Sequence, residues 1–331
     1  MARLALTRAL VGPPSTPVAS ARGYGLVALG AILWGCLGLF YQVVIGQYGL
    51  TSLEAVFWRA LIATLILSLW LAWRDPQSLR VKRRDLGLMF LLGAIGVAAT
   101  FWIYAYAIRA VGMGVAAVLQ YVAPAWVTLF SVLFWGERVS ASRLVALFLA
   151  LTGVALVGRM YDLSGTQLSL LGVLAALATS LTYAAYILMI KTASRRGYGS
   201  RTILVYGLAV GTACLAPLQT GRSVAIIAGS PAIIPWLIAL GLVTLGAGAT
   251  FNAGLKVVTA SNASIVATVE PLTAMLLGWL VLRERMDTPQ VLGALCILAS
   301  VSVLQIHSRV RAPAASLDQF EEQYVTTGES L

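Results

Sequence analysis

A single acidic residue inside an apolar segment is the feature of this sequence best suited to chemistry. Glu270 stands eight residues into the apolar run 262–282. A helix that rises about 1.5 Å per residue carries it about 12 Å into a hydrocarbon core about 30 Å thick. A charge at that depth costs at least about 2.5–3.5 kcal/mol, so the carboxyl should face water, meet a partner or hold a proton. We predict that Glu270 binds a polar ligand or exchanges a proton; the alternative is that it only hydrogen-bonds neighbouring backbone.

Pro271 follows Glu270 directly and predicts a kink in the same helix. Proline lacks an amide donor and disfavours helical geometry at the residue before it. Carbonyl groups released by such a kink can coordinate a substrate in transporters with broken helices. Asn262 falls on the same helical face as Glu270. We therefore expect Asn262 and Glu270 to bind substrate together.

A second proline, Pro124, predicts the same kind of kink in another apolar run. The polar residues Gln120 and Tyr121 precede it and are the counterpart of the polar turn before Pro271. Asn252 adds an amide from a further apolar run. We assign Gln120, Tyr121 and Asn252 to substrate binding.

Arg59 is the other charged side chain inside an apolar run, 54–73. In the orientation derived below, it lies about 8 Å from the outer surface, whereas Glu270 lies about 18 Å below that surface. This gap of about 10 Å exceeds a salt bridge, so we expect the two residues to have separate roles. We predict a structural role for Arg59, which reaches toward the surface or pairs with Glu54. Binding of a substrate carboxylate is the alternative.

Aromatic side chains supply the remaining binding candidates. Rings that line a cavity stack on a substrate or hold an ammonium group by cation–π attraction, worth about 0.5–2 kcal/mol. The alternative is anchoring at the membrane surface, where Trp and Tyr gather. The candidates, paired by helical face, are Trp34 with Tyr41, Trp102 with Tyr106, and Tyr183 with Tyr186.

The chain around these residues has the composition of an integral membrane protein. Of its 331 residues, 60% are hydrophobic and 11% are charged, and the mean hydropathy is +0.88. An ordinary soluble domain carries about 25% charged residues. So few charges cannot cover a water-facing surface, which excludes a soluble globular enzyme. Long apolar runs must be helices, because isolated strands leave backbone groups unpaired in lipid. The ten predicted transmembrane helices are 24–45, 54–73, 86–108, 113–135, 142–158, 169–190, 201–219, 233–255, 262–282 and 289–306.

The distribution of basic residues predicts the orientation of these helices. Of the 23 Lys and Arg residues, 17 fall on the side of the two termini, five fall on the other side, and Arg59 lies within a span. Basic residues concentrate on the cytoplasmic side of membrane proteins. We therefore predict a multi-pass protein of the cell (inner) membrane with both termini in the cytoplasm. The net charge of +11 is an orientation signal and predicts no nucleic-acid partner.

Metal and cofactor chemistry find little support in the sequence. His307 is the only histidine, so no histidine-based metal cluster or catalytic triad can form. The three cysteines, Cys36, Cys214 and Cys296, lie in apolar runs and predict free thiols. No phosphate-binding loop of the GxxxxGK[ST] type is present, which argues against ATP-driven pumping. We predict no metal and no cofactor.

The second half of the chain repeats features of the first. Five helices in each half make the halves cross the bilayer in opposite directions, and inverted repeats place a ligand site at their interface. The Glu-Arg pairs that follow the fourth and ninth helices are expected to cap helix ends, with gating as the alternative. We predict a disordered tail 1–22, repeats 23–160 and 161–306, and a disordered tail 307–331. A shift of 147 residues aligns Pro124 with Pro271, Glu137 with Glu284, Arg138 with Arg285, Tyr104 with Phe251, and Arg109 with Lys256.

These patterns resemble the drug/metabolite transporter superfamily, in particular its ten-helix EamA-type members, from about Tyr24 to Ile306. The resemblance implies two inverted five-helix repeats around a central cavity and transport of small metabolites, often amino acids, commonly outward. One departure is Arg283, which stands where the family usually has glycine, so we expect that turn to differ. The segments that carry the resemblance are Leu33-Trp34-Gly35, Trp58-Arg59-Ala60, Pro124 with Trp135-Gly136-Glu137-Arg138, and Glu270-Pro271 with Arg283-Glu284-Arg285.

The leading hypothesis is a secondary transporter and not an enzyme. It exports small organic metabolites, such as amino acids or amines, by alternating access around a central cavity. Transport is coupled to protons through Glu270 or is uncoupled. Efflux of cationic or aromatic drugs is the alternative, and an intramembrane enzyme or a channel is less favoured. The expected partners are a small-molecule substrate and membrane lipid, and the chain is a monomer or a homodimer.

Overall fold

The computed structural model describes residues 21–137, 139–162, 169–283 and 285–306, and all regular structure in these ranges is helical. Nine segments are long and apolar enough to cross a membrane, and the segment Ala141–Val157 is shorter but also apolar. The all-α, ten-helix prediction is thus confirmed. The predicted tails lie, apart from Ala21 and Arg22, outside the described residues. The ten segments are Ala21–Gln47, Ser52–Arg74, Arg83–Val111, Met113–Trp135, Ala141–Val157, Leu170–Arg195, Ser200–Leu218, Pro231–Val257, Ala260–Val281 and Thr288–Ile306.

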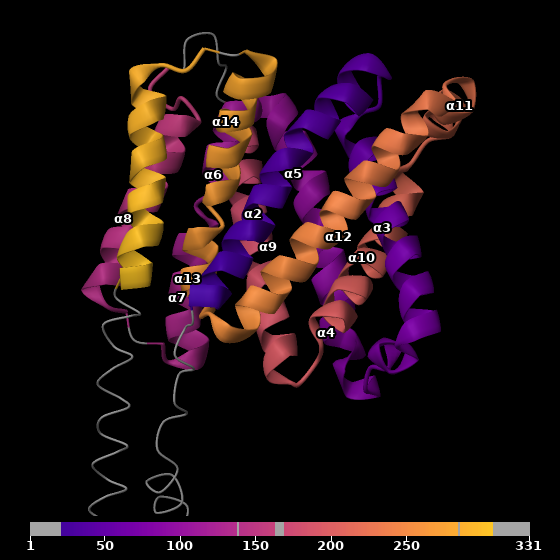
Figure 1. Cartoon of the computed structure of the whole chain (residues 1–331), viewed down its shortest axis with the longest axis horizontal. Coiled ribbons are helices and arrows are strands. Elements are labelled where there is room, and N and C mark those ends of the chain that lie inside the picture. The colour runs from indigo at the N-terminus through magenta and orange to yellow at the C-terminus, as the bar shows by residue number, and fades with distance from the viewer. Residues whose placement is uncertain (1–20, 138, 163–168, 284, 307–331) are drawn as a thin grey trace, which may run out of the picture.

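Several segments combine more than one helix. Stretches of π-helix, Gln42–Gln47 and Ala94–Ala99, extend the first and interrupt the third, and such stretches often mark functional sites. The short helix α11 was not predicted. The helices in Figure 1 are α2 (Ala21–Tyr41), α3 (Ser52–Arg74), α4 (Leu86–Gly93), α5 (Thr100–Val111), α6 (Met113–Gln120), α7 (Ala123–Trp135), α8 (Ala141–Val157), α9 (Leu170–Arg195), α10 (Ser200–Leu215), α11 (Arg222–Gly229), α12 (Ile234–Val257), α13 (Ala260–Val266) and α14 (Val269–Leu282), before the last helix Thr288–Ile306.

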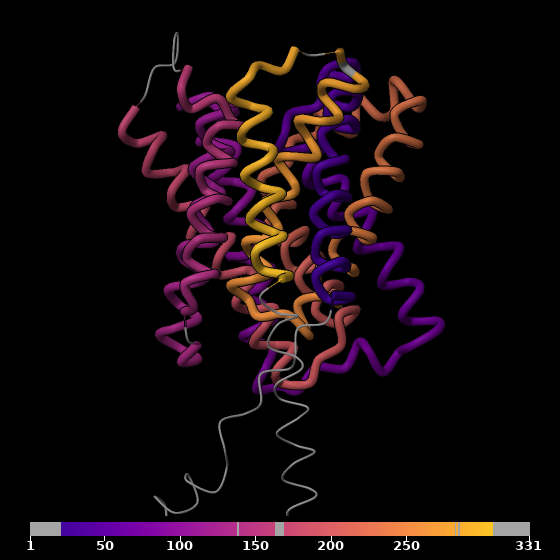
Figure 2. Tube along the Cα trace, turned by 60° about the vertical axis from the view of Figure 1, so that its left-hand side comes forward, coloured from indigo at the N-terminus to yellow at the C-terminus, as the bar shows by residue number. Residues whose placement is uncertain are grey.

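The two described ends of the chain, at Ala21 and Ile306, lie on the same side of the bundle (Figures 1 and 2). An even number of crossings produces this arrangement. We call this side the terminal end, and the side that carries α11 the opposite end. The prediction that the terminal end faces the cytoplasm is not tested by the fold.

The two halves of the chain pack mainly on each other. α2 packs along α12 and α5 along α9, while α3 packs on α12 and α4 on α10. Each contact recurs with the halves exchanged. The first segment packs on the eighth as the third packs on the sixth, and the second packs on the eighth as the third packs on the seventh. This is the pattern that inverted repeats would produce. The repeat relation itself stays a prediction.

Glycine allows the fifth and tenth segments to cross closely at the edge of the bundle. A Cβ at Gly153 of α8 would stand 2.7 Å from the carbonyl oxygen of Gly293, and a Cβ at Gly293 would stand 2.7 Å from that of Gly153. No side chain fits between these backbones. Small residues permit such approaches between helices in membranes.

The fourth and ninth segments are each interrupted just before a proline. α6 ends at Gln120 and α7 begins at Ala123, so Pro124 is the second residue of α7. α13 ends at Val266 and α14 begins at Val269, so that Glu270 and Pro271 lie in the first turn of α14. A proline is tolerated in a first turn because its missing amide has no helical partner there. Both breaks fall inside their segments, where they place polar residues away from the bundle ends.

The turns after these two segments have nearly the same backbone conformation. Gly136, after α7, has φ 62° and ψ 25°, and Arg283, after α14, has φ 57° and ψ 30°. The expectation that the Arg283 turn would differ is therefore wrong. The left-handed conformation costs a non-glycine residue roughly 1–2 kcal/mol, which the closure of the helix end offsets. Two residues of the predicted Glu-Arg pairs, Arg138 and Glu284, lie outside the described residues.

Candidate functional site

The broken helices bring Glu270 to the centre of a polar group. Its carboxyl lies beside the Tyr121 hydroxyl, which sits at the break between α6 and α7. Tyr183 of α9 and Tyr104 of α5 lie close enough to interact electrostatically with the same carboxyl. Glu270 remains partly accessible although it lies among helices of both halves. The first and second halves thus meet at one carboxyl group.

α2 packs directly against the helix turn that carries Glu270. A Cβ at Gly35 would stand 2.7 Å from the Glu270 carbonyl oxygen and 2.7 Å from the Thr273 Cβ. Tyr41, at the end of α2, interacts electrostatically with Glu270. Gly35 therefore sets the distance between α2 and α14, and with it the place of Tyr41.

Arg59 belongs to the same group and does not reach the surface. Its side chain is buried, at 6% exposure. Its guanidinium carbon lies 4.6 Å from the centre of the Phe101 ring and 5.7 Å from that of Tyr41. Glu54 is not its partner, because the Glu54 carboxylate binds Arg222 at 2.9 Å. The structure thus departs from both expected contacts of Arg59.

Arg59 and Glu270 interact electrostatically without touching. Glu270 senses the Arg59 charge, but no ion pair within 4 Å joins them among the described residues. Tyr186 of α9 also faces Arg59, and its ring is stacked with that of Tyr183 at 6.3 Å between centres. A cation and an acid from different helices therefore lie in the same group of side chains. We call this set of residues the Glu270 group: Glu270, Arg59, Tyr41, Tyr104, Tyr121, Tyr183 and Tyr186.

Several polar atoms in and near this group are buried without a hydrogen-bond partner in the described part of the protein. They include Arg59 Nε, the Tyr183 hydroxyl, Gln120 Oε1 and both amide atoms of Asn252. Asn252 is only 1% exposed. A buried polar group without a partner costs about 1–3 kcal/mol, and more where lipid surrounds the protein. These atoms come from α3, α6, α9 and α12, and all have free capacity for a polar ligand.

Trp34 extends this region along α2. Its ring lies 4.9 Å from that of Phe251 on α12, the residue before Asn252. Trp34 also packs between two apolar clusters of the core. Trp34 therefore packs α2, which contacts Glu270, against α12, which carries Asn252.

Trp102 and Tyr106 lie outside the Glu270 group. They are 55% and 41% exposed. Tyr104 lies between them in sequence, about 200° around the helix from each, and it is the residue of α5 that faces Glu270. Tyr104 thus lies where the sequence predicts its two neighbours. The alignment of Tyr104 with Phe251 in the internal repeat was the signal that could have identified it.

Asn262 is also separated from Glu270. It lies in α13, before the break, and its Nδ2 donates to the Tyr24 hydroxyl at 2.7 Å. Its Oδ1 accepts a hydrogen bond from Arg143 Nε at 3.1 Å. The helical wheel fails here because Ala267 and Thr268 interrupt the helix between the two residues. Asn262 therefore belongs to the terminal end and not to the Glu270 group.

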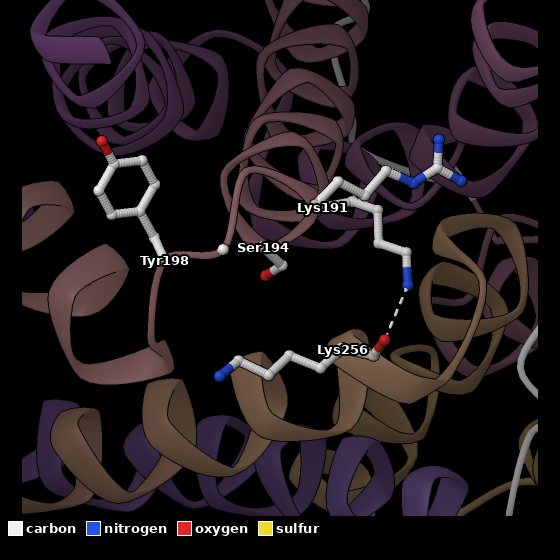
Figure 3. A pocket seen from close by; sticks show the side chains of 6 residues that line it. Lys191, Ser194, Tyr198 and Lys256 are labelled. Carbon is white, nitrogen blue, oxygen red and sulfur yellow. Dashed lines mark hydrogen bonds between the residues drawn. The ribbon is translucent and has the colours of Figure 1, made fainter. Parts of the chain in front are cut away.

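A cavity of about 270 Å³ lies elsewhere, between the ends of α9 and α12 (Figure 3). Lys191 lines it, but its ammonium group donates to the carbonyl oxygens of Leu255 at 2.6 Å and Val258 at 2.7 Å. Basic side chains are favoured at the ends of helices, where carbonyl groups lack partners. Lys191 therefore caps the end of α12. We assign the cavity to the packing of these helix ends and not to substrate binding. The cavity is lined by Lys191, Ser194, Arg195, Gly197, Tyr198 and Lys256.

Metal-binding residues do not gather in the described ranges, where no group of three or more His, Cys, Asp or Glu side chains is found. Cys36, Cys214 and Cys296 are free thiols.

Comparison with known proteins identifies relatives of the whole chain. The sequence model of the EamA-like transporter family matches residues 21–159 and again 170–305. An uncharacterized transporter of Archaeoglobus fulgidus is 32% identical over 287 residues, which cover 85% of this chain and 95% of its own. The uncharacterized inner membrane transporter YicL of Salmonella typhimurium is 25% identical, covering 87% and 97%. The pseudopaline exporter CntI of Pseudomonas aeruginosa is 26% identical, covering 77% and 86%. These descriptions indicate a transporter and not an enzyme.

A solved crystal structure has the same fold. It matches with a TM-score of 0.71 over 88% of this chain and 100% of its own chain. Its sequence is only 16% identical, so the likeness concerns the fold alone.

Proposed function

The chain belongs to the EamA-like transporter family and is a membrane transporter, and we propose that it is a secondary carrier with its substrate site at the Glu270 group. The supporting observation is the set of buried polar atoms without partners around this group. Structural burial alone would leave their desolvation uncompensated. A polar substrate that enters between the helices would satisfy them. Alternating access around this point follows from the place of the group between the two halves.

We propose that the substrate is a zwitterion, such as an amino acid. Arg59 presents a guanidinium without an ion-pair partner among the described residues, which suits a carboxylate. Glu270 presents an acid to the same region, and it suits an ammonium group. The rings of Tyr41, Tyr183 and Tyr186 then contact the substrate side chain. Because Arg59 and Glu270 form no ion pair with each other among the described residues, each can pair with one charge of the substrate.

Export is the proposed direction. One relative is described as an exporter, which supports this direction by analogy. We further propose that the terminal end faces the cytoplasm, because 17 of the 23 basic residues fall on that side of the predicted topology. Substrate would then enter from the terminal end and leave at the opposite end.

Transport in proteoliposomes tests the site and its coupling together. Proteoliposomes that contain the purified protein are loaded with labelled amino acids or amines, and efflux is followed with and without a pH gradient. We expect the gradient to accelerate wild-type efflux and to have no effect on the slower residual efflux by Glu270→Gln, in which the substrate ammonium group also loses its acidic partner. Gradient-driven efflux by Glu270→Gln would remove this residue from proton coupling.

Tyr183→Phe and Tyr106→Phe form a matched pair for substrate binding. The Tyr183 hydroxyl is buried without a partner, whereas Tyr106 is 41% exposed. Loss of one hydrogen bond of about 1 kcal/mol corresponds to roughly a fivefold higher KM. We expect this change for Tyr183→Phe and an unchanged KM for Tyr106→Phe. Equal effects would place the site elsewhere.

Efflux of organic cations is the second candidate, and the aromatic rings beside Glu270 favour it. The charge of Arg59 opposes it, because like charges repel in a region of low dielectric constant. Arg59→Gln separates the two candidates. A carrier of zwitterions loses amino-acid transport in this variant, whereas a carrier of cations gains transport of amines.

A further inference from the structure

Polar side chains from both halves form a continuous network at the terminal end. The Asn262 amide donates to the Tyr24 hydroxyl at 2.7 Å and accepts from Arg143 at 3.1 Å. Arg143 also binds Glu137 Oε2 at 3.3 Å, and the Ser261 hydroxyl donates to the same oxygen at 3.1 Å. We call Tyr24, Glu137, Arg143, Ser261 and Asn262 the terminal network.

The terminal network is buried and joins elements that are distant in sequence. Tyr24 is 1% exposed, and the side chains of Glu137 and Arg143 are 9% and 12% exposed. Tyr24 lies at the start of α2, Glu137 and Arg143 lie around the start of α8, and the other two residues begin α13. Charge-assisted hydrogen bonds are roughly twice as strong as neutral ones, and burial protects them from competing water. The network therefore ties α13 to both α2 and α8.

Among the described residues of the opposite end, no such network reaches the start of α6. A shift of 147 residues places Gly114 on Ser261 and Val115 on Asn262, and neither side chain can form a hydrogen bond. The same shift places Gln290 on Arg143. Gln290 donates to the Val157 carbonyl oxygen and accepts from Arg159, so it joins α8 to the last helix only. The start of α6, the counterpart of α13, is not tied by polar side chains of this kind.

We propose that the terminal network is a lock that holds the carrier closed at the terminal end and must open before substrate can pass there. The inference rests on the proposed function, because a lock matters only if the two ends open in turn. Asn262 and Arg143 are positioning residues in this account. They hold α13, which leads directly into the break before Glu270, and they do not contact substrate. The residues that bind substrate are then reached from the opposite end in the conformation described here.

Accessibility of a cysteine tests the lock without any substrate. Gly38 of α2 lies on the face of Trp34 and Tyr41 and is exposed, and a Cβ there meets no atom within 4 Å. Gly38→Cys is made in a chain whose three native cysteines are replaced by alanine. A membrane-impermeant maleimide is then applied from one side of the membrane at a time, in oriented vesicles.

We expect labelling of the parent chain to be much faster from the opposite end than from the terminal end. Asn262→Val copies the residue at position 115 and removes two hydrogen bonds of the network. It should raise labelling from the terminal end at least tenfold. Tyr24→Phe removes one of these bonds and should raise it severalfold, which keeps the test available if Asn262→Val does not fold. Val115→Asn is the control at the opposite end and should leave labelling from the terminal end unchanged.

Unchanged labelling from the terminal end in folded Asn262→Val and Tyr24→Phe would overturn the lock. The lock also requires that Val115→Asn is labelled from the terminal end at the same rate as the parent chain. Failure of the proposed function is recognised separately. In that case, the parent chain moves no amino acid or amine in proteoliposomes, whatever the labelling pattern shows.

Discussion

At the terminal end, Ser261 and Asn262 bind side chains of the other half of the chain, whereas the positions that the predicted repeat aligns with them are Gly114 and Val115. Helix positions and breaks at the two ends are similar, since α6–α7 and α13–α14 are both interrupted just before a proline. The difference therefore lies in side chains and not in the path of the backbone. If the two halves are inverted repeats, as proposed, two conformations of similar energy follow, and we expect a few polar side chains to decide which of them is populated.

The largest effect on this comparison is expected from Arg143→Gln. This variant leaves the buried carboxylate of Glu137 without its cation, and loss of one partner of a buried ion pair costs about 3–5 kcal/mol. Gln290→Leu at the opposite end removes the hydrogen bonds to the Val157 carbonyl oxygen and from the half-exposed Arg159 but breaks no ion pair, and should cost about 1–2 kcal/mol. Free energies of unfolding in detergent, from denaturant titration, measure both. Equal destabilisation of the two variants would contradict the claim that polar side chains hold the terminal end more strongly than the opposite end.

A smaller effect is expected at the two helix-terminal turns. Arg283 has φ 57° and Gly136 has φ 62°, and the left-handed conformation costs a non-glycine residue roughly 1–2 kcal/mol. Arg283→Gly should therefore stabilise the protein by about 1 kcal/mol, and Gly136→Arg should destabilise it by a similar amount. Thermal unfolding of each variant against the wild type measures the sign. A destabilised Arg283→Gly variant would show that the Arg283 side chain holds this turn by other contacts.

The smallest effect is a pH dependence at the opposite end. The Tyr161 hydroxyl donates to Asp287 at 2.6 Å and, with the nearby Arg159, lowers the pKa of the Asp287 carboxyl. Because the folded pKa lies below the ordinary value of about 3.9, the stabilisation is complete above that value. It is lost as the pH falls through the folded pKa.

Asp287→Asn tests this dependence. The variant lacks the titrating group, so its unfolding temperature should fall less than that of the wild type between pH 5 and the acid limit of the experiment. The side chains of Arg159 and Asp287 are 47% and 39% exposed, so the difference should be small. Parallel curves for the two proteins would assign the acid sensitivity to other groups.

Element positions were predictable because hydropathy is a local property of the chain. The ten apolar runs determined ten helices to within a few residues at most boundaries. Pro124 and Pro271 likewise indicated where two helices would break, since a missing amide acts on its own turn. The short helix α11 was missed because its eight residues lie between two spans and show no long apolar run.

The candidate site was less predictable because it depends on contacts between helices. Glu270, Tyr121 and Tyr183 were assigned from depth and sequence, and the structure brings them together. Tyr104 was missed because its rotation about the α5 axis follows from packing on α9. The expected contacts of Arg59 were wrong, since a count along one helix does not show which side chains of other helices pack on it.

The sequence by itself determined that this chain forms ten apolar helices, that Glu270 lies inside one of them and that two helices are broken beside prolines. These features follow from side-chain hydrophobicity and backbone geometry within one segment. Only the tertiary structure decided that Arg59 and Glu270 face one region, that Trp102 and Tyr106 do not, and that Asn262 joins Tyr24 and Arg143. Such contacts depend on the rotation and tilt of packed helices, and no spacing within a single helix contains that information.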